Sequence, residues 1–236
     1  MHLPSESLNG AICPVTAAVA AGAIVLAAYT LKRKPWKRPA LWHFTLTTTA
    51  VFAMQALNYA LPAGFSGHML GAVFAASVLG IPAAILSLAL VITVQCLAFS
   101  DGGTLQLGAN ILNMAVIATS VGGLIIDRLG NANRYLAIAL GATVSIMAAV
   151  GAIAIELFVG GRPDGALTRT LLVSHIPIAL IEGVLTLALV NVQNVPIWRN
   201  DRKTEYALAT ISLIALLLSP LASTLPDALE AALGTR

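Results

Sequence analysis

The sequence predicts an all-α polytopic membrane helical bundle, with seven core transmembrane helices, one additional C-terminal helix and the N-terminus outside. Of its 236 residues, 58% are hydrophobic and only 10% are charged, whereas soluble domains carry about a quarter charged residues. Apolar runs of roughly 20 residues, the length that crosses a bilayer, recur along the chain. Short basic segments separate several of these runs, as in loops between membrane spans. These features argue against a soluble domain.

Each apolar run predicts one helix. The run at 69–80 is short and is separated from its successor by Gly80-Ile81-Pro82, so we expect 69–99 to form two helices joined by a tight hairpin. The first seven helices form one expected unit, residues 1–195. The polar segment 199–205 attaches the eighth helix, which belongs to a second expected unit, residues 196–236. The eight predicted helices are 12–31, 40–60, 69–80, 82–99, 109–126, 135–158, 170–192 and 206–222.

The basic residues predict the orientation of the bundle, because Lys and Arg near span ends stay on the cytoplasmic side. With the N-terminus outside, ten of the 13 Lys and Arg residues fall in inner loops. This distribution predicts a multi-pass protein of the cell membrane, and it argues against a nucleic-acid partner. The ten are Lys32, Arg33, Lys34, Lys37, Arg38, Arg128, Arg134, Arg199, Arg202 and Lys203.

The first two residues, Met1 and His2, form a potential metal chelate. No positive charge precedes the first apolar run, so we expect no cleaved signal segment and a free amine on Met1. The terminal nitrogen, the deprotonated His2 amide nitrogen and the His2 ring can close two fused chelate rings around one ion. A fourth nitrogen would complete a square plane, which suits nickel(II) or copper(II). The alternative is that a Met-His start occurs by chance.

A second histidine, His68, lies in the glycine-rich segment Gly64–Gly71, on the same predicted side of the membrane as His2. It is either a metal ligand or a hydrogen-bonded packing residue. His43 lies near the inner boundary, where an interfacial role suffices.

Four further polar residues fall inside predicted helices. Asn110 and Asn113 either hydrogen-bond neighbouring helices or orient a metal ligand. His175 and Glu182 are ionisable groups within a span, which is costly and marks a functional candidate. For Glu182, a hydrogen bond to a helix and a role in ion passage remain equally open.

The motifs that carry a family resemblance are Met1-His2-Leu3-Pro4, Ser66-Gly67-His68, Gln95 with Asp101-Gly102-Gly103, Gly108-Ala109-Asn110 with Asn113-Met114, and His175-Ile176-Pro177 with Ile181-Glu182-Gly183. In this order they resemble the CbiM/NikM family, the substrate-binding (S) components of energy-coupling factor (ECF) transporters for cobalt and nickel. The resemblance covers nearly the whole chain. It implies that Met1, His2 and His68 hold the ion. We expect Ser66, Asn110, Asn113 and His175 to lie around these ligands.

The resemblance also implies partners. It implies a membrane coupling component of the ECF transporter and ATPase subunits. Residues 217–223 and Pro226-Asp227-Ala228-Leu229-Glu230 resemble part of the small NikN-type accessory component, so a NikN-like membrane protein is a further expected partner. The loop around His68 resembles the nickel branch, so Ni²⁺ is the expected cargo and Co²⁺ the alternative.

Two other functions remain open. Gly64-Phe65-Ser66-Gly67 fits a Gly-x-Ser-Gly pattern, so Ser66 and His175 could serve an intramembrane serine protease. A channel or a structural bundle would carry no tight metal site. The chain has no Walker motif, so we expect it not to hydrolyse ATP and not to be an enzyme.

Overall fold

Long apolar runs form the helices of this protein, as the sequence predicts. The computed structural model describes residues 1–8, 10–62, 64–160, 164–193, 206, 208–210, 212–214, 217 and 223–234. The helices are α1 (Ile12–Arg33), the 3-10 turn η1 (Pro35–Lys37), α2 (Leu41–Gln55), α3 (Ala72–Leu79), α4 (Ile81–Phe99), α5 (Leu107–Asn110), the π-helix η2 (Ile111–Ile117), α6 (Ala118–Leu129), α7 (Arg134–Val159), α8 (Gly165–Gln193) and α10 (Ala228–Leu233).

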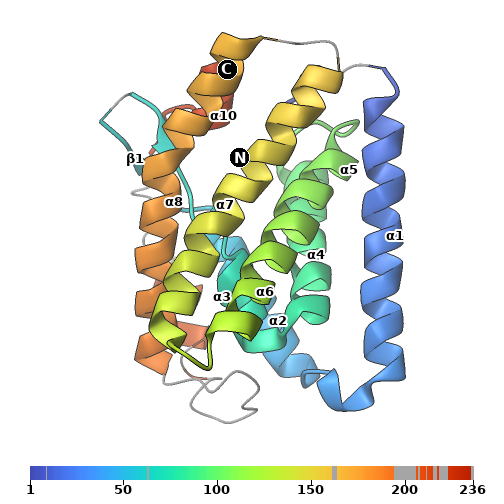
Figure 1. Ribbon diagram of the computed structural model, residues 1–236, viewed down its shortest axis with the longest axis vertical. Coiled ribbons are helices and arrows are strands. Elements are labelled where there is room, and N and C mark those ends of the chain that lie inside the picture. The colour runs from blue at the N-terminus through green and yellow to red at the C-terminus, as the bar shows by residue number, and fades with distance from the viewer. Residues whose placement is uncertain are drawn as a thin grey trace.

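Five helical stretches in the described part of the chain are long and apolar enough to cross a membrane. They pack into an all-α bundle (Figure 1), which confirms the predicted fold class and a multi-pass membrane protein. The five are Ile12–Arg33, Ile81–Phe99, Leu107–Leu129, Arg134–Val159 and Gly165–Val190.

Four of the predicted helices need comment. The hairpin at Gly80 forms as expected, with α3 ending at Leu79 and α4 beginning at Ile81. The run 40–60 forms only α2, because Tyr59–Ala60 instead pairs as strand β1 with β2 (Ser66–Gly67) in an antiparallel hairpin. Of the predicted helix 206–222, the residues that the structure describes are helical, and the others lie outside the described residues.

The short helix α3 lies in the middle of the bundle and the long helix α1 at its edge (Figure 1). All eight residues of α3 are buried. In contrast, α1 exposes apolar side chains such as Val25 and Leu26 along its length. An exposed apolar face of this kind suits lipid, in which the helix satisfies its own backbone groups.

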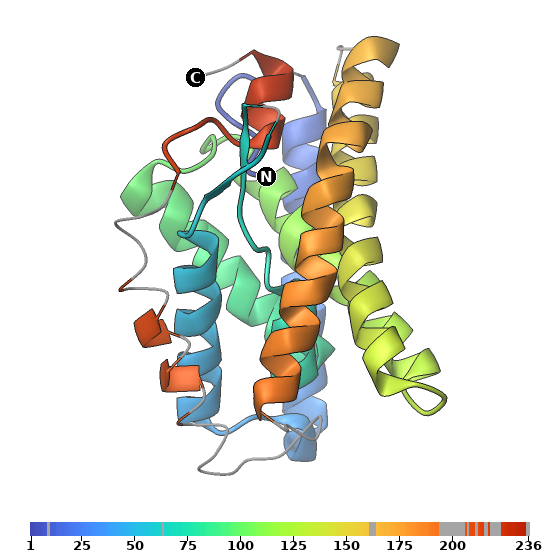
Figure 2. The same ribbon diagram turned by 90° about the vertical axis from the view of Figure 1, so that its left-hand side faces the viewer.

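The N-terminus, the β1–β2 hairpin and α10 lie together at one end of the bundle (Figure 2). The opposite end carries Lys32 and Arg33 in the last turn of α1 and Arg128 near the end of α6. The molecule is therefore polarised along its long axis.

Candidate metal site

The first three residues form an arm that is inserted into the bundle, with Met1, His2 and Leu3 almost fully buried. Asn110, at the end of α5, fixes this arm. The Asn110 Oδ1 atom accepts a hydrogen bond from Leu3 N–H at 2.7 Å, and its Nδ2 atom donates to the Leu3 carbonyl at 3.3 Å. Gly103 N–H also donates to that carbonyl, at 2.9 Å. The backbone that directly follows His2 is thus held by specific partners.

Gly102 provides the space for this arm. Its φ of +90° lies in the region that favours glycine. A Cβ atom there would lie 2.8 Å from Asn110 Nδ2 and 3.1 Å from His2 Cβ. The chain therefore needs glycine here both for its backbone conformation and for the approach of the arm.

The Met1 amine meets His68, which follows strand β2. The amine nitrogen lies 3.0 Å from His68 Nε2. The rings of His2 and His68 stack, with centroids 5.9 Å apart and planes 20° apart. Two nitrogens at adjacent corners of a square, each about 2.0 Å from one ion, lie about 2.8 Å apart. The observed spacing between Met1 and His68 is close to that value.

Two carboxylates face the nitrogens of the arm. The Met1 amine forms an ion pair with Asp227, the residue that precedes α10. The His2 Nδ1 atom lies 3.2 Å from Asp101 Oδ1, in the loop after α4. Nδ1 is also the ring nitrogen that can close a chelate ring with the amide nitrogen of the same histidine. Each side chain that opposes the arm is therefore paired with a nitrogen that could bind an ion.

Burial and charge set the protonation of these groups. Burial, aided by the nearby terminal amine, lowers the pKa of His68 to about 3, so its ring stays neutral and can donate a lone pair to a metal. Burial alone would raise the pKa of Asp101, but the hydrogen bond and charge of His2 outweigh it and lower that pKa to about 2. For Asp227, burial is again outweighed, here by the charge of the terminal amine, which holds its pKa well below the usual range.

Glu182 on α8 supports the loop that carries His68. Its two carboxylate oxygens accept the N–H groups of Leu70 and Gly71, each at 2.8 Å. Gly71 has a φ of +72°, which turns both N–H groups toward the carboxylate at the start of α3. Of the alternatives open for Glu182, the structure shows a hydrogen-bonding role, and its partners are backbone groups.

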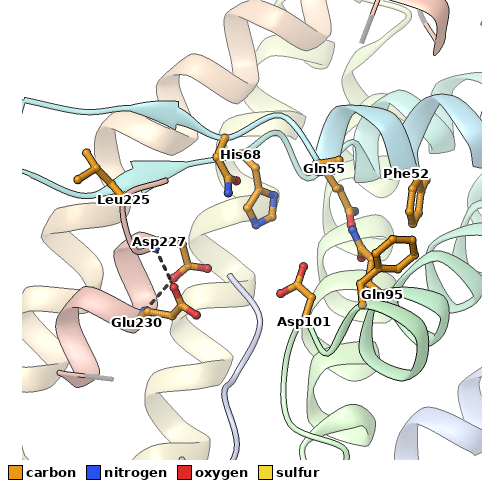
Figure 3. A pocket seen from close by; sticks show the side chains of 11 residues that line it. Phe52, Gln55, His68, Gln95, Asp101, Leu225, Asp227 and Glu230 are labelled. Carbon is orange, nitrogen blue, oxygen red and sulfur yellow. Dashed lines mark hydrogen bonds between the residues drawn. The ribbon is translucent and has the colours of Figure 1, made fainter. Parts of the chain in front are cut away.

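A polar cavity of about 380 Å³ opens beside these residues (Figure 3). His68, Asp101 and Asp227 lie around it, with Gln55 and Gln95 on the α2 and α4 side. Within the described residues there is no cluster of three or more His, Cys, Asp or Glu side chains that could hold a metal. A metal ion at this end would therefore depend on backbone and terminal nitrogens as well as imidazoles.

A family model described as "Cobalt uptake substrate-specific transmembrane region", CbiM, matches residues 2–195. The chain belongs to the CbiM family. This match contains the arm from His2 onward and the His68 loop, whereas Asp227 lies outside it.

Named relatives and solved structures agree with this assignment. A relative from Archaeoglobus fulgidus named "Putative fused nickel transport protein NikMN" is 32% identical over 81% of this chain and 64% of its own length. A fused nickel transport protein NikMN of Rhodobacter capsulatus is 34% identical over 51% of this chain and 35% of its own. The cobalt transport protein CbiM of Acetoanaerobium sticklandii is 29% identical over 60% of this chain and 62% of its own. The chain thus spans less than two thirds of each of these relatives.

The chain also resembles crystal structures of a transition metal transporter and of a truncated transition metal transporter. The first is 29% identical, with a TM-score of 0.71 over 82% of this chain and 92% of that one. The truncated form is 29% identical, with a TM-score of 0.68 over 81% of this chain and 97% of that one.

Not every residue predicted for the site of this CbiM-family chain contacts the proposed ligands. Asn113, on the π-helix η2, donates to Glu156 Oε2 at 2.7 Å and not to the arm. His175 Nδ1 bonds to the Leu171 carbonyl at 2.8 Å, and its buried Nε2 has no hydrogen-bond partner.

Ser66 likewise does not touch the arm. The Ser66 hydroxyl donates to the carbonyls of Leu225 and Pro226 at 2.8 and 3.2 Å. In the described part of the chain no hydrogen bond joins Ser66 to His175, so the pairing that a serine protease requires is not formed.

Sequence reasoning missed two residues at the site and one buried carboxylate. Asp101 and Asp227 belong to motifs on which the family resemblance rests, but the sequence does not indicate which nitrogen atoms they face. Glu156 was missed because its partner, Asn113, lies 43 residues earlier on another helix.

Proposed function

We propose that this CbiM-family chain binds a divalent transition metal ion, nickel in preference to cobalt, and passes it across the cell membrane as the S component of an ECF transporter. The observation that supports this most is the 3.0 Å approach of the Met1 amine to His68 Nε2 in a buried position. The two nitrogens belong to residues that lie 67 positions apart in the sequence.

The proposed ligands are the Met1 amine, the His2 amide nitrogen, His2 Nδ1 and His68 Nε2. Four nitrogens in a plane suit nickel(II), which is the reason for the preferred ion. Binding requires the amine and the amide each to lose a proton. With neutral imidazoles, the site carries a charge of +1 before binding, from the Met1 ammonium group. After binding it again carries +1, because the charge of the divalent ion is reduced by one by the His2 amide anion. Asp101 and Asp227 therefore face the same net charge in both states.

The site lies at the end of the bundle opposite Lys32, Arg33 and Arg128, so we propose that it faces the outside. A membrane coupling component and ATPase subunits would supply the energy for uptake. We further propose that residues 1–195 are the ion-binding unit and that 196–236 act as a NikN-like accessory segment, with a separate NikN-like membrane protein as a further partner.

Nickel titration of the purified protein in detergent tests this proposal. We expect tight binding of one ion to the wild type, and loss of at least about 100-fold in affinity for His2→Ala, for His68→Ala and for a protein with one residue added before Met1. His43→Ala is the matched control, because His43 is also buried but stacks on Trp42 at the far end of α2. Equal affinity for the wild type and the N-terminally extended protein would rule out the chelate. Competition between nickel and cobalt in the same assay decides the preferred ion.

A further inference from the structure

The segment 223–230 docks directly onto the strand that leads to His68. Ser66 N–H donates to the Pro226 carbonyl at 2.8 Å, and Ser66 also pairs with Asp227 as a β-bridge. The Ser66 hydroxyl donates to the Leu225 and Pro226 carbonyls. At the other end, Ser223 N–H donates to the Asn58 carbonyl at 2.7 Å. These bonds fix the register of the segment. Asp227 is paired with Ser66, which precedes His68 by two residues.

The two carboxylate oxygens of Asp227 have different partners. Oδ1 accepts the N–H groups of Leu229 and Glu230, each at 2.8 Å, and so caps α10. Oδ2 accepts a hydrogen bond from the Met1 amine. Glu230 completes the cap by accepting Asp227 N–H at 3.1 Å. Because the cap holds Oδ1, the side chain cannot turn Oδ2 away from the amine without losing these bonds.

We propose that Asp227 is a positioning residue of the metal site, which binds the terminal amine in both the metal-free and the metal-loaded protein. This inference rests on the proposed function, in which the Met1 amine is a ligand. An amine bound to a metal through its lone pair keeps two hydrogens, and Oδ2 can accept one of them. Partners of this kind orient metal ligands, and their loss typically costs 10- to 100-fold in affinity.

The capping of α10 does not by itself explain why residue 227 is an aspartate. An N-cap needs an oxygen that accepts backbone N–H groups, which asparagine or serine supplies without charge. Glu230 lies in the same segment and lines the same cavity, yet its side chain accepts a hydrogen bond from the Asp227 N–H group and completes the cap of α10. A charged oxygen at Asp227 is therefore matched to the amine and not to the helix.

Asp227→Asn and Glu230→Gln form a matched pair for the test. Each removes one negative charge from the same cavity and leaves an oxygen for the cap, but only Asp227 faces the amine. We expect nickel affinity in the full-length protein to fall about 10- to 100-fold for Asp227→Asn and to stay within about twofold of the wild type for Glu230→Gln. At saturating nickel, the visible absorption band of Asp227→Asn should match that of the wild type, because the four nitrogen ligands are unchanged. Should Asp227→Asn not fold, Asp227→Ser keeps the cap and takes its place.

Three results would overturn the inference. The first is wild-type nickel affinity in Asp227→Asn. The second is an equal loss of affinity in Asp227→Asn and Glu230→Gln, which would mean that only the net charge of the cavity matters. The third is a shifted absorption band in Asp227→Asn, which would make Asp227 a direct ligand. If the wild type itself binds no nickel, the proposed function fails and this inference fails with it. If all three proteins bind nickel with the same high affinity, the proposed function stands and only the role of Asp227 is disproved.

Discussion

Asn110 and Leu3 exchange two hydrogen bonds in opposite directions, between an amide side chain and a backbone residue 107 positions away. This pair holds the backbone directly after the two ligand-bearing residues Met1 and His2. We expect Asn110→Ala to weaken nickel binding about 10- to 30-fold, because two hydrogen bonds of about 1 kcal/mol each are lost. Isothermal titration measures the change. Asn113→Ala is the control, since Asn113 is equally buried but bonds to Glu156. An equal loss of affinity in both variants would contradict the role of Asn110.

Glu182 should control nickel affinity through the His68 loop, although it does not touch the proposed ligands. Glu182→Gln can accept only one of the two N–H groups of Leu70 and Gly71, and its own amide N–H group would oppose the other. We expect a loss of about tenfold in nickel affinity. Glu156→Gln is the matched control, because it changes another buried carboxylate, which lies on α7 and bonds to Asn113. If Glu182→Gln binds nickel as the wild type does, the loop does not depend on this carboxylate.

Gly102→Ala should displace the N-terminal arm. The added Cβ would meet Asn110 Nδ2 and His2 Cβ, and the positive φ adds a strain of about 1 kcal/mol or more. We expect at least a tenfold loss of nickel affinity, with the helical content by circular dichroism unchanged. Gly151→Ala on α7 serves as the control, because a Cβ there has no neighbour within 4 Å. Unchanged binding by Gly102→Ala would show that the arm tolerates another path.

The stability of the metal-free protein should fall between pH 6.5 and about 4 because of His68. Its pKa is about 3 in the folded protein, against an ordinary value of 6.5. In this interval the unfolded chain binds a proton that the folded protein does not, so the free energy of unfolding decreases as the pH falls. The melting temperature in detergent at pH 7 and pH 4.5 measures this effect. His68→Asn should lose less stability over the same interval, and parallel curves for the two proteins would contradict the prediction.

Below about pH 3.8 a second loss of stability should begin. The pKa of Asp101 is lowered to about 2 from its ordinary 3.8, so the stability that it contributes is present above that ordinary value and is lost as the pH falls through the folded one. In a plot of melting temperature against pH, Asp101→Asn should reduce the loss of stability below about pH 3.8 and leave unchanged the loss that is due to His68.

The sequence allowed the helices to be predicted because apolar runs carry a strong signal in a membrane protein. It did not reveal the β1–β2 hairpin, because each strand has only two residues and the first lies within the apolar run 40–60. The π-helix η2 was equally hidden, because its composition is that of the helices on either side. In both places tertiary packing, and not local propensity, determined the backbone.

The proximity of Met1, His2 and His68 could be expected only from the family resemblance. The partner of Glu182 could not, because backbone N–H groups are present in every residue and leave no mark in a sequence. Asp227 is separated from its partner by 226 positions, and no spacing rule reaches that far. Polar contacts between distant segments are therefore the part of this site that required a structure.

The contact between Met1 and Asp227 has a consequence for the order of assembly. Contacts between residues so far apart form late, because the intervening chain must first be ordered. During synthesis the amine cannot meet its carboxylate until residue 227 has left the ribosome, by which time every long helix of the bundle has been made. We therefore expect tight capture of an ion only after residue 227 has been made, and chains that stop before it to bind metal poorly.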